Sequence, residues 1–277
     1  MLALNRDESL DGGLTRVAAE TIAQLFDSES VHDARRRLKE IRAILRLGRY
    51  ALDASFGPLN ELFRDAAREL AAQRDADAAV AAAQSLRAHT DDPLERRALT
   101  RVTRLVPSVG QASACPHAGG RLQPVLQGAR INFSASGTGW FERGLRRSYR
   151  DGRRAFGEAR RSRTPEAIHE WRKRVKDLWY EVRIVAPAFP AVLDAHAGLL
   201  HDLSRLLGEH HDVWSLRARV DRKFGRVTAK RVAAIAERRL AGIEPLIFEK
   251  GAFAYAERPG AWSESLVRYW RAWTERL

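Results

Sequence analysis

Two stretches of the sequence place a histidine ahead of a series of basic residues at helical spacing. In the first stretch, residues of this kind recur every three or four positions along one edge of an expected helix: His32, Arg35, Lys39, Arg42, Arg46 and Arg49. The second stretch repeats the pattern with His169, Arg172, Lys176 and Arg183. Guanidinium and ammonium groups in a row can donate hydrogen bonds to oxyanions. The spacing therefore predicts binding of an extended anion.

Neighbouring residues modify these two basic stripes. Arg36 widens the first and Lys173 the second, whereas Trp179 takes the position that Arg42 holds in the first stripe. Like charges three and four residues apart repel by a few tenths of a kcal/mol per pair, and an anionic ligand would relieve that repulsion. The alternative is that both stripes are solvated helix faces paired with acidic neighbours such as Asp65 and Asp202.

The charge balance points to the same segments. The 277 residues carry 48 Lys plus Arg and 35 Asp plus Glu, a formal net charge of +13. Residues 31–50 contribute +5 and residues 141–183 contribute +7. An acidic partner is expected, and weak nonspecific binding of nucleic acid would follow from such a charge alone.

Apolar residues recur at three and four positions through most of the chain, which predicts an all-α fold with little strand. We expect a tail over 1–13, a first helical bundle over 14–106, a Pro/Gly-rich connector over 107–139 and a second bundle over 140–277. The expected helices are 14–26, 28–50, 59–88 and 93–106 in the first bundle, and 140–160, 165–186, 191–220, 228–250 and 262–276 in the second.

The two halves correspond at a fixed offset of 137 residues, which aligns His32 with His169 and Arg68 with Arg205. The same offset places Asp27 over Thr164, and both are good helix N-caps. This correspondence predicts an internal duplication, with one four-helix bundle from each half.

Four segments resemble the CHAD family, the conserved-histidine α-helical domain. They are SVHDARRRLKEIRAILRLGR (30–49), GLRRSYRDGRRAF (144–156), AIHEWRKRVKDLWYEVRIV (167–185) and LLGEHHDVWSL (206–216). The resemblance covers nearly the whole chain from about residue 14 and implies two pseudo-twofold-related four-helix bundles with a basic surface between them. It also implies binding of inorganic polyphosphate, often on polyphosphate granules. The binding positions that it implies are His32, Arg35, Arg36, Lys39, Arg42, Arg46, His169, Arg172, Lys173, Lys176 and Arg183, with Arg68 and Arg205 added from the repeat.

Two other functions use some of the same residues. A metal-dependent phosphohydrolase of the HD type would draw its ligands from His169, His201, Asp202, His210, His211 and Asp212. Because the repeat leaves most of these histidines unmatched, we expect no catalytic residue, metal or other cofactor. A nucleic-acid-binding protein could stack bases on aromatic residues, namely Trp140, Tyr149, Trp171, Trp179 or Tyr180, but no known nucleic-acid-binding motif occurs.

The location of the protein is predicted from what the sequence lacks. It has no signal peptide, no apolar stretch long enough to span a membrane, and one cysteine, Cys115. We therefore expect a cytoplasmic protein, with its oligomeric state left open. The amphipathic segment 265–277 is expected to dock on the second bundle rather than on a membrane.

Overall fold

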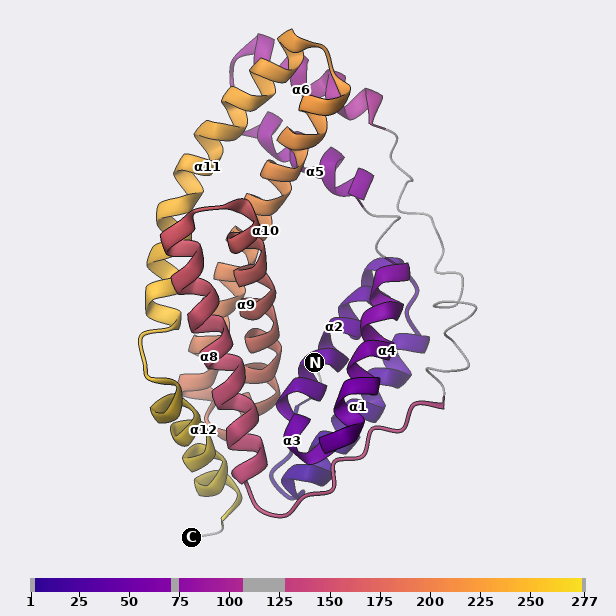
Figure 1. The fold of residues 1–277 in the computed structure, drawn as a ribbon, viewed down its shortest axis with the longest axis vertical. Helices are drawn as coiled ribbons and strands as arrows, with labels where there is room; N and C mark the ends of the chain where they lie inside the picture. Colours follow the sequence, from indigo (N-terminus) through magenta and orange to yellow (C-terminus); the bar gives the residue numbers. More distant parts are fainter. Residues whose placement is uncertain (1–2, 71–74, 107–127, 276–277) are drawn as a thin grey trace.

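A computed structural model describes residues 3–70, 75–106 and 128–275, with the side chains of 75–77 left undescribed. Within these ranges the regular structure is helical throughout, which confirms the all-α prediction (Figure 1). The α-helices of the first half are α1 (Leu10–Phe26), α2 (Val31–Leu47), α3 (Arg49–Leu52), α4 (Phe56–Glu69), α5 (Asp75–Ala88) and α6 (Pro93–Leu105). Those of the second are α8 (Gly139–Ser162), α9 (Pro165–Val185), α10 (Pro190–Lys223), α11 (Arg226–Ala254) and α12 (Pro259–Thr274). Two short 3-10 turns, Asp53–Ser55 and Ala186–Ala188, complete the order.

Side-chain caps fix where the two stripe helices begin. Thr164 caps α9, with its Oγ1 accepting from the Ala167 N–H at 3.3 Å, as the sequence predicts. The cap of α2 is Ser30, whose Oγ accepts from the Asp33 N–H at 3.1 Å. The prediction that Asp27 caps α2 is wrong, because Asp27 is the C-cap of α1. The two helix starts therefore do not align at the offset of 137.

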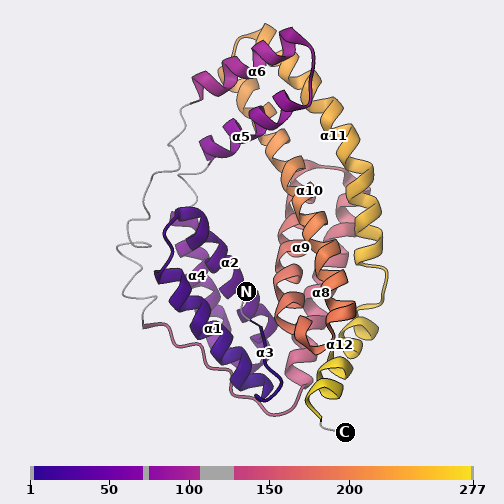
Figure 2. The same ribbon diagram turned by 180° about the vertical axis from the view of Figure 1, so that it is seen from behind.

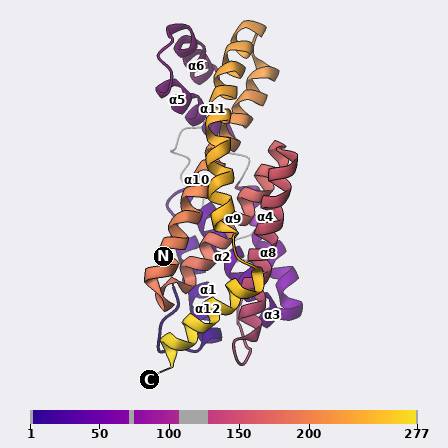
Figure 3. The same ribbon diagram turned by 90° about the vertical axis from the view of Figure 1, so that its left-hand side faces the viewer.

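The stripe helices meet in one continuous core. Helices α1 and α4 each pack on α2, α2 also contacts α8 and α9, and α12 packs on α8. Leu4 belongs to the same core, and its N–H donates to the Ile184 carbonyl oxygen at 3.0 Å. Seen edge-on, α12 crosses the lower end of the long helices (Figure 3). The core thus joins the two halves of the chain around α2 and α9.

The grouping of helices differs from the expected four in each bundle. Helices α5 and α6 pack on each other and on α10 and α11 (Figures 1 and 2). At 34 residues α10 is roughly 50 Å long and extends well beyond the 21-residue α9. Its extension and that of α11 carry an apolar face, with Leu216, Val232 and Ile235 among its residues, which α5 and α6 cover to form a second small core. The expected single helix 59–88 is described as α4 and α5, and residues 71–74 between them lie outside the described ranges.

Candidate anion-binding site

The buried faces of α2 and α9 decide where their basic edges point. Leu38 and Ile41 of α2, and Trp171 and Val175 of α9, are fully buried, as their spacing predicts. With those faces fixed in the core, the adjacent basic edges of the two helices are turned toward a common space. That space lies between the first and second halves of the chain.

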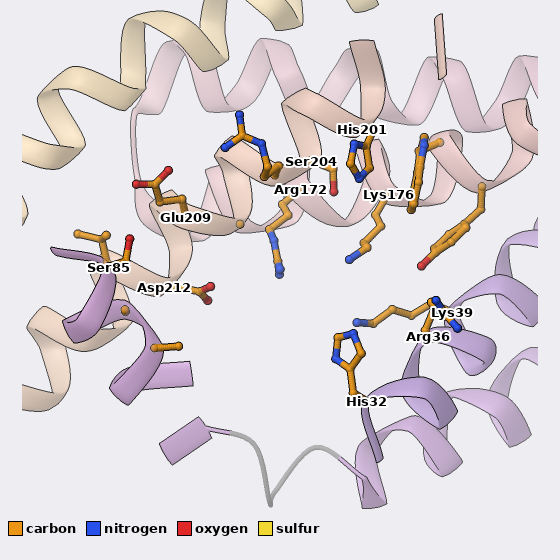
Figure 4. Close-up of a pocket in the computed structure, with 17 residues that line it drawn as sticks. His32, Arg36, Lys39, Ser85, Arg172, Lys176, His201, Ser204, Glu209 and Asp212 are labelled. Atoms are coloured by element: carbon orange, nitrogen blue, oxygen red, sulfur yellow. The ribbon is translucent and has the colours of Figure 1, made fainter. Parts of the chain in front are cut away.

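This space is a cavity of about 540 Å³ lined by α2, α5, α9 and α10, which we call the main cavity (Figure 4). Its basic lining comes from three helices: Arg36 and Lys39 from α2, Arg172 and Lys176 from α9, and Arg205 from α10. His32 and His201 also line it. Lys39 and Lys176 extend into the cavity from opposite sides (Figure 4).

The acidic residues of the main cavity are fewer and lie on α10. Glu209 and Asp212 are the two carboxylates among its lining residues, against five Lys and Arg. Glu209 also accepts a hydrogen bond from the Arg239 Nε at 2.5 Å, so its charge is compensated from outside the lining. With both histidines neutral, the lining residues carry a net charge of +3. The cavity is therefore suited to an anion.

Six of the thirteen predicted site residues line the main cavity: His32, Arg36, Lys39, Arg172, Lys176 and Arg205. Arg42 and Arg46 line a separate cavity of about 390 Å³, which we call the arginine cavity. The other residues that line it are Arg49, Phe56, Asn60, Arg64, Arg147, Ser148, Asp151, Arg174 and Asp177. The first basic stripe therefore divides between two sites.

The remaining predicted residues make contacts elsewhere. Arg35 donates from Nη1 to the Leu70 carbonyl oxygen at 2.7 Å, so it ties α2 to the C-terminal end of α4. Lys173 forms an ion pair with Glu170 at 2.7 Å, and the Arg183 guanidinium lies 4.9 Å from the Trp179 ring centroid. Arg68 is exposed on α4 and pairs with Asp65 at 3.3 Å. The repeat predicted Arg68 and Arg205 equally as binding residues, but only Arg205 lines the main cavity.

His169 lies beside the main cavity rather than among its lining residues. Its ring packs on His211 of α10 with centroids 4.2 Å apart, and its Nδ1 is buried without a hydrogen-bond partner in the described part of the chain. Burial, followed by the positive form of His211, lowers the pKa of His169 to about 4. The imidazole is therefore neutral at pH 7 and adds no charge to the site.

Several lining residues were missed by the reading of the two stripes. His201, Ser204, Gly208 and Asp212 follow one face of α10 at helical spacing, next to the predicted Arg205, so the sequence did contain a signal for that wall. Ser85 of α5 had no such signal, because only the packing of α5 on α10 brings it to the cavity.

The histidines and carboxylates of the metal hypothesis are spread over separate contacts. His210 faces Glu244 at 3.7 Å, His201 packs on Trp179 with ring centroids 5.0 Å apart, and His169 packs on His211. Among the residues that the structure describes, no three His, Cys, Asp or Glu side chains are grouped so that they could hold a metal ion. Cys115 lies outside the described residues. In the described ranges, no helix is both long and apolar enough to cross a membrane.

The fold and site define an all-helical domain in which helices from both halves frame a basic cavity. The family model for the CHAD domain matches residues 10–221, and the chain belongs to this family. The sequence resemblance is thereby confirmed. The CHAD domain is associated with polyphosphate binding. The search of curated proteins gave no match.

Proposed function

We propose that this protein binds inorganic polyphosphate in the main cavity and does not process it chemically. The observation that carries the proposal is the convergence of Arg36, Lys39, Arg172, Lys176 and Arg205 on one cavity that has two carboxylates. A linear phosphate chain carries a negative charge on every unit and has no base or apolar group to recognise. Cationic donors on opposite walls match such a ligand.

The aromatic lining residues, Trp179 and Tyr180, fit this proposal because neither competes with the cations for the phosphate oxygens. Arg183 already covers the Trp179 ring. Burial raises the pKa of the Tyr180 hydroxyl above its usual value, so it stays a neutral donor at pH 7. We propose that the six predicted residues that line the main cavity contact the polyphosphate. Arg35 and His169 are assigned to positioning α2 and α9.

The proposal extends to the origin and location of the protein. An internal duplication is supported by the common order of a leading helix, a stripe helix and a third helix, α1–α2–α4 in the first half and α8–α9–α10 in the second. The aligned residues Arg35 and Arg172 both lie on the stripe helices. A protein that binds long chains would reside with them, on polyphosphate granules in the cytoplasm.

Calorimetric titration with long-chain polyphosphate tests the proposed site. The double variant Lys39→Gln/Lys176→Gln should bind roughly a hundredfold more weakly, because each lysine supplies a charged hydrogen bond of about 1.5 kcal/mol. The slope of log affinity against log salt should fall by about two. The control Lys223→Gln/Lys230→Gln removes the same charge from exposed positions on α10 and α11 and should bind like wild type. Equal affinities for the two variants would overturn the site.

Two further measurements separate this function from its alternatives. RNA at equal phosphate concentration should fail to displace long-chain polyphosphate, and displacement would favour a nucleic-acid-binding protein instead. Phosphorus NMR of polyphosphate incubated with the protein and Mg²⁺ or Mn²⁺ should show unchanged chain length. Release of orthophosphate would overturn the non-catalytic part of the proposal.

A further inference from the structure

The arginine cavity is a second concentration of positive charge that the proposed function does not use. Its charged lining consists of six arginines and two aspartates from α2, α3, α4, α8 and α9, which gives a net charge of +4. On α9 it is lined by Arg174 and Asp177, whereas the main cavity is lined by Arg172 and Lys176. Because successive residues are about 100° apart around a helix, Arg174 and Arg172 point to different sides of α9. The two cavities are therefore separate sites.

The two carboxylates of the arginine cavity are shared among several arginines. Asp177 pairs with Arg46 at 2.9 Å and lies 3.8 Å from Arg174. Asp151 lies 3.7 Å from Arg147 and equally far from Arg150, which is outside the lining. Both carboxylates thus form their ion pairs with arginines other than Arg42 and Arg49.

Arg42 and Arg49 make direct contacts with neutral side chains, and Asp177 and Asp151 act on them only from beyond ion-pair distance. Arg42 donates from Nε to the Asn60 Oδ1 at 3.3 Å, and Arg49 lies 4.3 Å from the Phe56 ring centroid. Neither forms an ion pair with the described residues. The Nε of Arg147 is buried without a hydrogen bond there, and its ion pair with Asp151 is long, at 3.7 Å. The cavity therefore presents two guanidinium groups, those of Arg42 and Arg49, that form no ion pair with the described residues, and a third, that of Arg147, with a long one.

The electrostatics of the site agree with this geometry. Burial, followed by the charge of Arg46, lowers the pKa of Arg42 to about 10. Burial and the charge of Arg147 lower the pKa of Arg49 as well. Burial is the larger cause of both shifts, and the positive potential of the neighbouring arginines adds to it. A bound anion would offset that potential.

The polar lining restricts the kind of anion. Phe56 is the one aromatic residue among the lining residues, and the Arg49 guanidinium covers its ring. The lining residues therefore include no second aromatic ring on which a nucleotide base could stack. A volume of about 390 Å³ accommodates more than one phosphate unit, and the net charge matches a small phosphate carrying three or four negative charges. Arginine forks suit its terminal oxygens.

We propose that the arginine cavity is a second anion site, which binds a compact inorganic diphosphate unit through Arg42, Arg49 and Arg147. The unit is a free pyrophosphate or the terminal pair of phosphates of a longer chain. This proposal goes beyond the proposed function, since pyrophosphate can occupy the cavity whether or not the main cavity holds polyphosphate.

Calorimetric titration with pyrophosphate tests the proposal. Wild type should bind one pyrophosphate, and Arg42→Gln/Arg147→Gln should bind at least tenfold more weakly. Arg154→Gln/Arg161→Gln removes the same charge from exposed positions on α8 and should bind like wild type. The main-cavity variant Lys39→Gln/Lys176→Gln should also bind like wild type. Absence of heat with wild type, or a loss confined to the main-cavity variant, would overturn the proposal.

Further arms cover folding and the source of the ligand. Circular dichroism and the melting temperature check that each variant is folded. Arg64→Gln/Arg147→Gln changes two lining arginines outside α2, 35% and 40% exposed. If Arg42→Gln disturbs α2, this variant should still show the loss of pyrophosphate binding. Long-chain polyphosphate that competes with pyrophosphate in the main-cavity variant would identify chain ends as ligands. Failure to compete would identify free pyrophosphate.

Discussion

The ion pair between Arg46 and Asp177 joins the two halves of the protein, and its removal should be costly. The atoms are 2.9 Å apart, and both side chains are 18% exposed. Asp177→Asn keeps the shape of the side chain but leaves Arg46 beside Arg42 and Arg174 without its counter-charge. Breaking a fully buried pair costs about 3–5 kcal/mol, and exposed pairs contribute about 0–1 kcal/mol. For this partly exposed pair we expect a loss of about 2 kcal/mol.

Urea unfolding of four proteins measures this loss: wild type, Asp177→Asn, Arg46→Gln and the double variant. A loss of about 2 kcal/mol corresponds to a fall in melting temperature of roughly 3.5 °C for a chain of this size. The double variant should be more stable than the sum of the single losses predicts, by about 1 kcal/mol, because the pair is lost only once. Asp65→Asn is the surface control, since Asp65 is half exposed and pairs with half-exposed Arg64 and exposed Arg68. It should cause no measurable change.

Two results would refute this reasoning. Asp177→Asn could unfold at the same urea concentration as Asp65→Asn, which would mean that burial adds nothing to the pair. Alternatively, the single losses could add in the double variant, which would mean that Arg46 and Asp177 do not interact. Pyrophosphate supplies a further check, because removal of Asp177 raises the positive charge of the arginine cavity. The ligand should therefore raise the melting temperature of Asp177→Asn more than that of wild type.

Three other changes test the packing and the buried ionisable groups. A Cβ at Gly144 would overlap the Leu47 carbonyl oxygen, so Gly144→Ala should cost about 2 kcal/mol in urea unfolding, whereas Gly57→Ala, with no atom within 4 Å, should gain about 0.5 kcal/mol; equal effects would contradict this packing. Burial raises the pKa of Glu181 well above its usual value, so the wild type should lose stability as pH rises from about 4.5, by up to about 1.4 kcal/mol per pH unit. Glu181→Gln should lack that dependence, and parallel stability curves between pH 5 and pH 8 would contradict a protonated Glu181. The pKa of His169 is lowered from 6.5 to about 4. Its contribution to folding stability is therefore complete above pH 6.5 and is lost as pH falls toward 4. His169→Gln should therefore lose stability less steeply than wild type over that range, and an equally steep loss would place the titration on other groups.

The sequence contained enough information for the helices because their signals are local. Apolar spacing predicted the ends of α8 and α9 to within two residues, and Thr164 was predicted as the cap of α9. The buried faces of α2 and α9 followed from the same spacing. The start of α2 was predicted wrongly, because Asp27 was expected to cap it and Ser30, three residues further on, does so. The cap depends on which of them lies next to the free N–H groups of the first turn.

The partition of the basic residues needed the tertiary structure. Helical spacing places Lys39, Arg42 and Arg46 along one edge, yet Lys39 lines the main cavity and the other two line the arginine cavity. The division depends on which helices pack against each part of α2, and that is set by contacts between residues far apart in the chain. Ser85 likewise lines the main cavity only because α5 packs on α10.

The sequence by itself determined the helical class, the family and the two basic stripes, because these depend on residue type and on spacing within single helices. Only the tertiary structure decided that α5 and α6 join α10 and α11 and that the stripe cations serve two cavities. The physical reason is that a helix can bury its apolar face against more than one partner. The choice among partners depends on the lengths and exposed faces of all the helices together.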